Sequence, residues 1–515
     1  MSKENPFLVI PMCGIGKRFK AAKYGLHKSL LEVKEKSMLE RVIHKFDGSI
    51  ETFIITTKDI YQEISNSSKL KILEEKYKII YLFIEPHSLG PGYSIYKAFD
   101  SLPLNRPFFI SYCDITWDYK GEISKIPEKN IDAAIFTHQG FHPHSVNNNF
   151  SAFCLPEKTN QRILSKIKEK SSFTDAWMNE QLSIGLFYIK NTKIAKKSLF
   201  QMIDDKNLVN GEYFPSLMFN YINESGIKVE LISVNSFAHY GTPKHFQDIN
   251  NWSDYFEKKR SIYRQSKIKH LNDAIIFTSG KGNRMKKISN LPKPLIKTKG
   301  ETLLEKVVDS LPIDREKIHL IFNELKTPLN FLSKNTNYVK IGSTSSQYDS
   351  LKAASDYIKN VKSFLLCSCD CYGYFDFLAL EKMKAEETFD VICFGFEPSL
   401  IQLQTKSNYS TFEYFNEQIT KINVKKISGQ SHLGLAGFFW IRDGDEMIKY
   451  ISNFQNKIND REIIVDDVIN DMLKSNKKIG FIHLHNYLHL GSEIEFKEYN
   501  YWQNHIQPLL KSSNE

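Results

Sequence analysis

The chain has 515 residues, of which 41% are hydrophobic and 13% aromatic, a composition typical of a globular protein and not of a disordered one. Its formal net charge is +10, but the lysines and arginines are scattered, and no zinc-finger, helix-turn-helix or RNA-recognition pattern accompanies them. No apolar run approaches the roughly 20 residues that a membrane-spanning helix needs. We therefore expect neither nucleic-acid binding nor a membrane span, and a positive field that suits anionic substrates.

The cysteines and the N-terminus indicate a reducing compartment. Seven cysteines form an odd set, and the first residues, MSKENPFLVIP, lack the longer apolar core of a secretory signal. We therefore expect reduced thiols and a cytoplasmic location. Cys367, Cys369 and Cys371 alternate, which predicts buried thiols on one face of a strand. The alternative, a zinc site, would need ligands from a second segment, and no C-x-x-C or H-x-x-x-H partner is evident.

The first predicted element is a buried strand at residues 7–10, an apolar run that suits a parallel sheet. Just after it, Gly14 and Gly16 precede Lys17 and Arg18. Two glycines two positions apart let a turn bring its backbone amides close to a ligand, because neither residue carries a Cβ. Outward-pointing amides followed by positive charge predict a pocket for a polyphosphate. An ordinary tight turn would carry the same glycines, so this pair alone does not decide.

A second copy of the pattern decides between these interpretations. In the first half, Lys28 follows the glycine turn, and a helix is expected to begin at Met38 after an apolar run. Residues 274–308 repeat this order of strand, glycine pair, arginine, lysine and helix. The matching residues are Gly280, Gly282, Arg284 and Lys293. A chance turn would not carry its strand, cations and helix to a second place, so the chain contains an internal duplication.

Both stretches resemble the signature of the nucleotidyltransferase superfamily that makes NDP-sugars and related activated phosphates. That signature is usually G-x-G-x-R-[FLM] followed by P-K-P-L. The second copy has L-P-K-P-L at residues 291–295, whereas the first has His27 and Ser29 on either side of Lys28. The resemblance implies an α/β fold of two tandem Rossmann-like, GT-A-like nucleotidyltransferase domains, each a mostly parallel sheet flanked by helices.

The duplication also predicts the domain boundaries. We expect residues 1–257 to form the first nucleotidyltransferase domain and residues 271–515 the second. Residues 258–270 between them are rich in lysine and arginine, which indicates a solvated basic linker. Each half is long enough to bury a core of its own.

Each half then shows a turn that opens a helix. Residues 85–98 are rich in glycine and proline there, and residues 344–353 hold the matching place in the second half. Such a turn is a natural place to bind a base or a ribose, with a plain helix-entry turn as the alternative. The resemblance implies a nucleobase loop, often T-x-G-Q-x-x-S, in which Gln347 fits the base-contacting position and Pro91 replaces it in the first copy. The predicted nucleotide contacts are Gly90, Ser94, Gln347 and Ser350.

Asp114 and Asp370 each follow an apolar strand. A carboxylate at the carboxyl end of a parallel strand lies where α/β sheets bind ligands, and Mg²⁺ needs only one or two carboxylates besides phosphate oxygens. The two aspartates are therefore predicted Mg²⁺ ligands, with a helix-capping role as the alternative. The resemblance implies a further metal-ligating aspartate near the end of each domain. His239 and His489 occupy that place, which makes them candidate ligands.

The acceptor-binding region is expected after the strand-end aspartate. In the first half it includes His142 and His144. Glu169 and Lys170 resemble the Glu-Lys pair of the family, whose lysine meets the acceptor phosphate. The second half has no such pair, and its nearest candidates are Lys421, Lys425 and Lys426.

The resemblance implies a reaction in which an NTP, CTP or another, and a phosphorylated sugar, small alcohol or amide give an NDP-acceptor and pyrophosphate. Capsule and surface-polysaccharide nucleotidyltransferases catalyse such reactions. The implied catalytic cations are Arg18, Lys28, Lys170, Arg284 and Lys293. The implied phosphate-binding loop residues are Gly14, Gly16, Lys17, Gly280 and Gly282.

Three other functions stay open. One half could be catalytic and the other a regulatory or structural copy. A glycosyltransferase of related architecture would need a D-x-D metal motif, which C-D-I at residues 113–115 and C-D-C at residues 369–371 do not supply. A non-catalytic nucleotide-binding protein would bind the NTP without releasing pyrophosphate. A homo-oligomer is compatible with any of these functions.

Overall fold

The computed structural model describes residues 5–46, 50–145, 151–257, 273–280, 282–298, 300–323, 335–404, 409–426, 433–454 and 461–511. The chain forms two compact units, of which the first comprises Met1–Ser253 with Tyr501–Glu515 and the second Asp254–Asn500. The sequence had assigned residues 501–515 to the second domain. The predicted linker, residues 258–270, lies outside the described residues.

The described part of the first unit is built on a nine-stranded sheet. Its strands are β1 (Phe7–Pro11), β4 (Glu51–Thr56), β5 (Ile79–Phe83), β6 (Phe108–Ser111), β8 (Ala133–Gln139), β9 (Ala152–Pro156), β10 (Leu164–Glu169), β11 (Gln181–Ile189) and β12 (Val229–Ser233). Their spatial order is β10-β9-β11-β6-β1-β4-β5, with β8 pairing with both β11 and β12. Two short antiparallel pairs join β2 (Glu32–Val33) to β3 (Lys36–Ser37), and β7 (Ile115–Asp118) to β13 (Ser236–His239).

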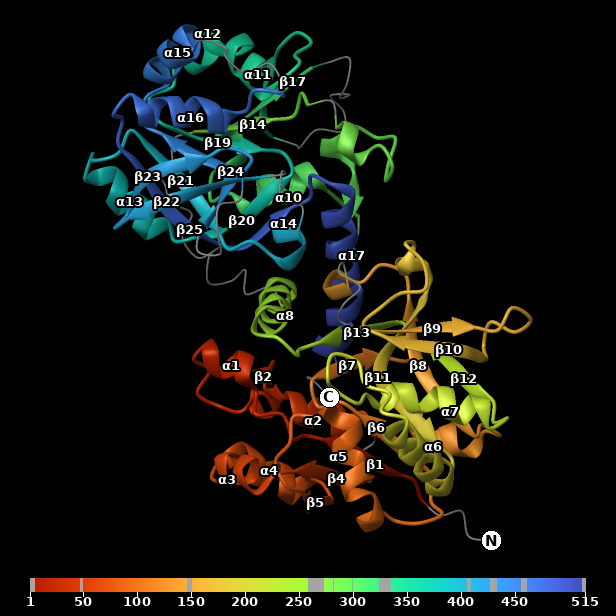
Figure 1. Cartoon of the computed structure of the whole chain (residues 1–515). Coiled ribbons are helices and arrows are strands. Elements are labelled where there is room, and N and C mark those ends of the chain that lie inside the picture. The colour runs from red at the N-terminus through yellow and green to blue at the C-terminus, as the bar shows by residue number, and fades with distance from the viewer. Residues whose placement is uncertain are drawn as a thin grey trace. The chain divides into compact units, whose positions relative to one another are not determined.

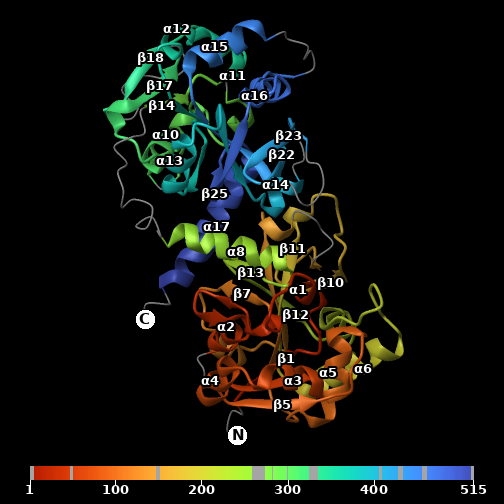
Figure 2. The same ribbon diagram turned by 90° about the vertical axis from the view of Figure 1, so that its left-hand side faces the viewer.

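The described part of the first unit contains several α-helices, some of which begin at a capping side chain. They are α1 (Lys17–Ala21), α2 (Met38–His44), α3 (Lys58–Ser65), α4 (Ser68–Lys76), α5 (Gly90–Ala98), α6 (Thr192–Asp204) and α7 (Met218–Glu224). The Ser37 hydroxyl accepts a hydrogen bond from the amide of Glu40 at the start of α2, and Thr57 does the same for Ile60 in α3. Figures 1 and 2 show α5 beside α6, and α5 packs on β1 and β4.

The predicted α/β fold is confirmed, but the sheet is mixed and not mostly parallel. Strands β5, β4, β1 and β6 run parallel to one another. Strand β11 runs antiparallel to β6, β8 and β9, and β9 is antiparallel to β10. Parallel neighbours need a long crossover, usually a helix. No α-helix lies between β8 and β11 among the described residues, so this part of the chain returns in antiparallel strands.

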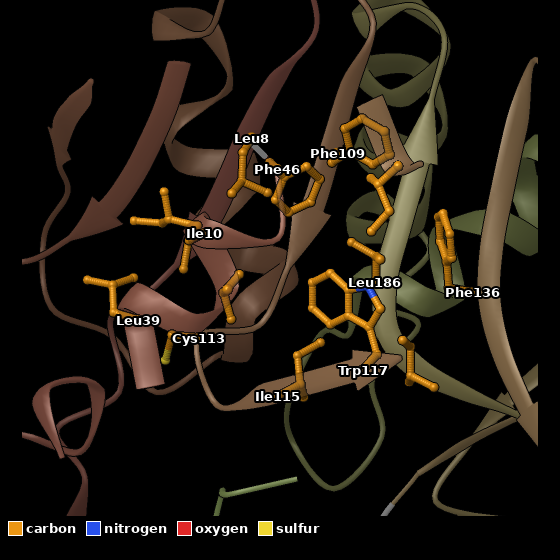
Figure 3. Close-up of a cluster of buried hydrophobic side chains, with 14 of the residues drawn as sticks. Leu8, Ile10, Leu39, Phe46, Phe109, Cys113, Ile115, Trp117, Phe136 and Leu186 are labelled. Carbon is orange, nitrogen blue, oxygen red and sulfur yellow. The ribbon is translucent and has the colours of Figure 1, made fainter. Parts of the chain in front are cut away.

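Strand β1 is buried on both faces, which explains its unbroken apolar sequence. Leu8 and Ile10 belong to one hydrophobic cluster, and Phe7 and Val9 belong to another. Figure 3 shows Leu8 and Ile10 in the cluster that also contains Trp117. Because successive side chains of a strand point to opposite faces, one short run of apolar residues anchors two cores.

The end of the chain contributes to the core of the first unit, which explains the corrected boundary. Helix α17 (Glu493–Lys511) brings Tyr501, Trp502 and His505 to this unit. The Tyr501 hydroxyl donates to the carbonyl of Phe237 at 2.6 Å, and Nδ1 of His505 lies 2.8 Å from the hydroxyl of Ser236. Trp502 is fully buried. These long-range contacts have no local signature in the sequence.

The described part of the second unit contains a ten-stranded sheet. Its strands are β14 (Asp273–Phe277), β17 (Ile318–Phe322), β18 (Asn337–Lys340), β19 (Phe364–Ser368), β20 (Cys371–Phe375), β21 (Val391–Phe396), β22 (Ser410–Phe415), β23 (Gln418–Asn423), β24 (Leu433–Ile441) and β25 (Ile479–His489). Short β15 (Lys297–Thr298) pairs with β16 (Glu301–Thr302). The helices are α10 (Leu303–Ser310), α11 (Gln347–Ala353), α12 (Ser355–Ile358), α13 (Phe377–Ala385), α14 (Leu400–Gln404), α15 (Gly444–Asn453) and α16 (Val465–Lys474). Helix α8 (Pro243–Phe256) ends inside this unit.

The two sheets share one strand order. From β18 the second sheet runs β18-β17-β14-β19-β24-β21-β25, and the first runs β5-β4-β1-β6-β11-β8-β12. Each pair of neighbours also has the same direction in both units, antiparallel on both sides of β24 and of β11 and parallel elsewhere. Figure 2 shows β14, β17 and β18 side by side in the second unit.

One prediction about the second unit is wrong. Cys367, Cys369 and Cys371 do not share a strand, because β19 ends at Ser368 and β20 begins at Cys371. A turn at Cys369 and Asp370 separates the two strands. The expectation of buried thiols is confirmed, since all three cysteines are buried.

No helix in the described residues is long and apolar enough to cross a membrane.

Candidate functional site

The first unit contains a cavity of about 860 Å³ at the carboxyl ends of β1 and β6. The residues of this half that the sequence predicted as catalytic cations, loop glycines, nucleotide contacts or metal ligands line it. They are Gly14, Gly16, Lys17, Arg18, Lys28, Gly90, Ser94, Asp114, Lys170 and His239. Residues more than 220 positions apart in the sequence therefore meet around one space.

The glycine loop forms one wall of the cavity. Gly16 adopts a left-handed conformation, with φ of 64°, immediately before α1. Phe19 is buried against Tyr24 and Phe246, which holds α1 in place. Lys17 and Arg18, by contrast, are exposed and line the cavity. The loop thus presents backbone amides and two cations to the same space.

His27 precedes Lys28 at the position that Pro292 occupies before Lys293 in the second half. Nε2 of His27 lies 3.0 Å from the carbonyl oxygen of Gly14 and must donate to it, which leaves Nδ1 to accept from the hydroxyl of Ser29 at 2.9 Å. His27 has φ and ψ of −58° and 141°, close to the −52° and 141° of Pro292. A buried histidine therefore sets the same backbone turn that proline sets in the second half.

Lys28 and Asp114 form a buried ion pair at the centre of the cavity. The Nζ atom of Lys28 lies 2.8 Å from Oδ2 of Asp114. Burial alone would raise the pKa of the Asp114 carboxyl, but the charges of Lys28 and His239 and the hydrogen bonds to the carboxylate together lower the pKa to about 2. Burial likewise opposes the charge of Lys28, yet Asp114 raises the pKa of Lys28 above its ordinary value. Both groups are therefore charged at neutral pH.

His239 lies beside this ion pair. Its Nδ1 atom is 3.2 Å from Nδ1 of His245, so one ring donates and the other accepts. Burial lowers the pKa of His239 and keeps its imidazole neutral at pH 7. A Cβ on Gly241 would lie 2.6 Å from Nε2 of His239 and 3.0 Å from Oδ2 of Asp114. The missing side chain of Gly241 therefore leaves space beside both candidate metal ligands.

Lys170 lines the cavity from the end of β10, which β9, β11 and β6 separate from β1 in the sheet. It follows β10 with a left-handed φ of 53°, which is uncommon for a residue other than glycine. Its Nζ atom lies 4.0 Å from Oε2 of Glu212 and 4.7 Å from the centre of the Phe214 ring. The neighbouring Glu169 accepts a hydrogen bond from the hydroxyl of Ser216, and burial raises the pKa of Glu169 to about 7. The strained backbone and these contacts hold one cation at the cavity wall.

The predicted nucleobase turn lies at the start of α5. Nε2 of His87 is 3.0 Å from the hydroxyl of Ser94, and both residues line the cavity. Gly90 has φ of 85°, and a Cβ there would lie 2.7 Å from Cβ of Glu212. Gly90 is therefore required by the backbone and by close packing. Whether this turn contacts a base stays a prediction.

The structure does not place the predicted His142 and His144 in the cavity. Both side chains are buried, and neither is among the residues that line it. The His142 ring packs on Phe237 with ring centres 4.0 Å apart, and His144 stacks on His245 at 4.1 Å. Residues Tyr501 and Trp502 of α17 pack on the two rings within the first unit, and the acceptor role expected for this region stays a prediction.

The second unit repeats the central ion pair. Lys293 contacts Oδ2 of Asp370, and Gly282 has φ of 62°, close to that of Gly16 in the first unit. A Cβ on Gly282 would lie 3.2 Å from Cβ of Lys293, so the glycine loop and the lysine are adjacent. Burial would raise the pKa of Asp370, but the charges and hydrogen bonds of Lys293 and His489 together lower it.

The histidine of the second unit has different neighbours. Nδ1 of His489 lies 2.7 Å from Oε1 of Glu495, and Nε2 lies 3.2 Å from Oδ2 of Asp370. Burial would lower the pKa of His489, but these carboxylates outweigh it and raise the pKa well above its ordinary value. Glu495 occupies the position that His245 holds six residues after His239. The two units therefore differ in the charge beside the aspartate.

Gln347 and Ser350, the predicted nucleotide contacts of the second unit, lie in α11. Nε2 of Gln347 donates to the hydroxyl of Ser368 at 3.4 Å, and its Oε1 accepts from the amide of Val465 at 3.3 Å. The buried hydroxyl of Ser350 lies 3.0 Å from that of Ser279. Both side chains thus connect the turn to the sheet, and their predicted contacts to a nucleotide stay predictions.

Of the three lysines named as possible counterparts of Lys170, the structure singles out Lys425. It follows β23 with a left-handed φ of 48°, and its amide donates to the hydroxyl of Ser410 at 3.1 Å. Burial and then the charge of Arg284 lower the pKa of Lys425, which places this lysine near the arginine of the predicted loop. Lys421, by contrast, pairs with Glu413 on β22.

The cavity of the first unit has the features of a site that binds two phosphorylated ligands. A glycine loop with two cations, a lysine paired with a strand-end aspartate and a second lysine across the cavity can hold a polyphosphate and a second anionic group together. Residues 8–170 match the model of the MobA-like NTP transferase domain family. This match supports a relation of residues 8–170 to the nucleotidyltransferase superfamily.

Known relatives match about 30% of the chain. A bifunctional protein GlmU of Methanocaldococcus jannaschii is 26% identical over 166 residues, which cover 30% of this chain and 40% of the relative. A GlmU of Methanococcus maripaludis is 27% identical over 165 residues, 29% of this chain and 40% of the relative. The chain therefore matches well under half the length of these relatives.

Solved structures of low sequence identity were also found. A nucleoside-diphosphate-sugar pyrophosphorylase from Vibrio cholerae RC9 aligns with 17% identity and a TM-score of 0.38 over 47% of this chain and 98% of its own. An inositol-1-phosphate CTP transferase from T. maritima aligns with 18% identity and a TM-score of 0.36 over 45% and 95%.

Proposed function

We propose that the protein is a nucleotidyltransferase that transfers NMP from an NTP to a phosphorylated sugar or a small phosphorylated alcohol or amide. One observation carries the proposal: the glycine loop, Arg18, Lys28, Asp114 and Lys170 line a single cavity in the first unit. An oxygen of the acceptor phosphate attacks the α-phosphorus of the NTP. The bond from that phosphorus to the bridging oxygen breaks, and pyrophosphate leaves with the electron pair. No covalent enzyme intermediate is needed, so positioning and charge do the catalysis.

The residues of the cavity supply these two effects. The amides around Gly14 and Gly16, with Arg18, bind the β- and γ-phosphates and neutralise the leaving pyrophosphate. Lys28 lies deeper and stabilises the charge that grows at the α-phosphate. Lys170 binds the acceptor phosphate, because it lies across the cavity from the loop and its position is set by Glu212 and Phe214.

The residues of the first unit fit a Mg²⁺ ion. Asp114 is an ionised, buried carboxylate, and the absent side chain of Gly241 leaves room next to its Oδ2 atom. Mg²⁺ prefers oxygen ligands and keeps several of them from water and substrate, so one carboxylate is sufficient. The ion would be held by Asp114, with His239 beside it, and would supply charge neutralisation for the triphosphate.

We propose that the second unit is also a nucleotidyltransferase domain. The shared strand order and the repeated Lys293–Asp370 pair support this. A second candidate is that only the first unit is catalytic and the other is regulatory. The contacts of Asp370 favour this alternative, since its Oδ2 atom is bound by Lys293 and by His489.

We further propose that the product is a precursor of a capsule or surface polysaccharide and that it is made in the cytoplasm. The basis is the resemblance of the first half to nucleotidyltransferases of that kind. Seven free cysteines are in accord with a reducing compartment. Lys170 offers one positive charge to the acceptor, which suits an acceptor with one phosphate.

The test is a panel of reactions with the full chain. Each of the four NTPs is incubated with Mg²⁺ and each of a set of phosphorylated sugars, alcohols and amides, and products are identified by mass. The proposal expects one NTP–acceptor pair to give equal amounts of NDP-acceptor and pyrophosphate. Pyrophosphate release without any NDP-acceptor, or transfer of a sugar from an NDP-sugar, would contradict it.

A further inference from the structure

The second unit brings together three side chains that can hold a metal ion. Asp370, Cys371 and His489 each offer one ligand atom, and these atoms lie within 4.8 Å of one another. The Sγ atom of Cys371 is 3.7 Å from Oδ1 of Asp370, and Nε2 of His489 is 3.2 Å from Oδ2 of the same aspartate. A zinc site at these cysteines requires a ligand from a second segment of the chain, which the sequence alone did not identify. In the structure that segment is the end of β25, which contributes His489.

Strand pairing places the thiol and the imidazole side by side. Cys371 at the start of β20 is the direct antiparallel partner of His489 at the end of β25. Directly paired residues of antiparallel strands point to the same face, with Cβ atoms about 4.5–5.5 Å apart. Asp370 joins them because its carbonyl accepts a hydrogen bond from the amide of Leu490, at 2.9 Å. The cluster is thus built on sheet backbone and not on a free loop.

The spacing suits a tetrahedral ion. Zinc bound by nitrogen, oxygen and sulfur at about 2.0–2.3 Å places its ligand atoms about 3.3–3.8 Å from one another. The separation of 3.7 Å between Sγ of Cys371 and Oδ1 of Asp370 lies in this range, and one ligand atom from each of the three residues lies within 4.8 Å of the others. Lys293 bonds Oδ2 of Asp370, which leaves Oδ1, the oxygen nearer the thiol, for the ion.

The surroundings of His489 have the form that zinc sites use. Its other nitrogen, Nδ1, contacts buried Glu495, which in turn accepts a hydrogen bond from the hydroxyl of Ser492 at 2.6 Å. A carboxylate on the far nitrogen orients a histidine and makes it a stronger ligand. A Cβ on Gly491 would lie 2.3 Å from Nε2 of His489, so this glycine keeps one side of the cluster open.

We propose that Asp370, Cys371 and His489 bind Zn²⁺, with a fourth position open toward Gly491 for water or a phosphate oxygen. Three protein ligands with one open position are typical of catalytic zinc sites. The sequence had placed Mg²⁺ at Asp370, but thiolate and imidazole select zinc over magnesium. In the first unit Ile115 is the strand partner of His239, so the matching cluster has no thiol. The proposal does not depend on nucleotidyl transfer.

Metal binding to the full chain tests the proposal. The protein is stripped with a chelator and titrated with Co²⁺, which reports thiolate ligation by an intense near-ultraviolet absorption band, and then with Zn²⁺ in competition. We expect one Co²⁺ per chain with this band, and its loss when one equivalent of Zn²⁺ is added. Cys371→Ser should abolish the band. Glu495→Gln should weaken affinity by about 10–100-fold.

The matched control is Cys393→Ala, which removes a buried thiol from β21 in the same unit and should leave the band unchanged. Circular dichroism and thermal melting check that each variant is folded, and His489→Gln gives a second variant that removes a ligand without touching a thiol. A band that persists in folded Cys371→Ser or His489→Gln protein would overturn the proposal. So would a wild-type chain that binds Co²⁺ without the band, or that binds no Co²⁺.

Discussion

Replacing Lys28 with methionine removes one charge from the cavity and keeps the length of the side chain. Lys28 is the largest favourable influence on ionised Asp114, whose pKa is held at about 2 against an ordinary 3.8. That difference of 1.8 corresponds to about 2.4 kcal/mol of stabilisation of the carboxylate. Since the variant loses the main interaction that lowers this pKa, we expect its free energy of unfolding to fall by an amount on the order of this net value at pH 7. We also expect turnover to fall by about 10²–10³-fold, as when one charge-stabilising donor is lost.

The assay is pyrophosphate release at saturating NTP, Mg²⁺ and acceptor, with urea unfolding measured on the same protein. Lys20→Met is the matched control, because Lys20 lies on α1 and forms an exposed pair with Glu63. An exposed pair contributes about 0–1 kcal/mol, so turnover should stay within twofold. Lys28→Met protein that is folded and retains wild-type turnover would refute the role given to Lys28 and Asp114 in the first unit.

Three further predictions concern the same unit. Lys170→Ala should raise KM for the acceptor about 10–100-fold with a smaller effect on KM for the NTP, since a charge-assisted phosphate contact contributes about 1.5–3 kcal/mol; equal changes in both would argue against an acceptor role. The pKa of Glu169 is raised to about 7, so the folded state binds the proton more tightly than the unfolded state and stability falls between pH 4.5 and 7. The melting temperature of Glu169→Gln should therefore fall less than that of wild type between pH 5 and pH 8. An equal fall in both proteins would contradict this. Burial lowers the pKa of His505 to about 3, so the unfolded state binds the proton first and stability falls as pH drops below 6.5. Between pH 7 and pH 5 the wild-type protein should therefore lose about 2 kcal/mol of its free energy of unfolding through His505. Urea unfolding of His505→Phe should not show this loss.

The sequence located the glycine loop, the lysine and the aspartate of the candidate site because each of these residues belongs to a local pattern. Gly16, Lys28 and Asp114 each follow a strand or a turn that short-range rules predict, and parallel strands bring their carboxyl ends to one edge of the sheet. The matching residues in the second half favoured this interpretation over a chance turn. The roles of these residues were then inferred from a resemblance, and the cavity shows only that they meet.

What the sequence missed depends on contacts between distant segments. The hydrogen bond from His27 to Gly14 replaces a proline that local rules would require, and nothing in the sequence reports it. Cys371 and His489 become neighbours only through the pairing of β20 with β25. The sequence of β11 did not indicate that this strand is antiparallel to β6, because a buried apolar run has the same pattern in a parallel and an antiparallel strand.

The central claim is that the cavity of the first unit binds a triphosphate, and a crystal structure of the full chain with the NTP selected by the reaction panel tests it most directly. The account predicts β- and γ-phosphates against the amides of Gly14 and Gly16 and the guanidinium of Arg18, with Lys28 turned to the α-phosphate. A nucleotide bound elsewhere, with Arg18 and Lys28 making no phosphate contact, would contradict it.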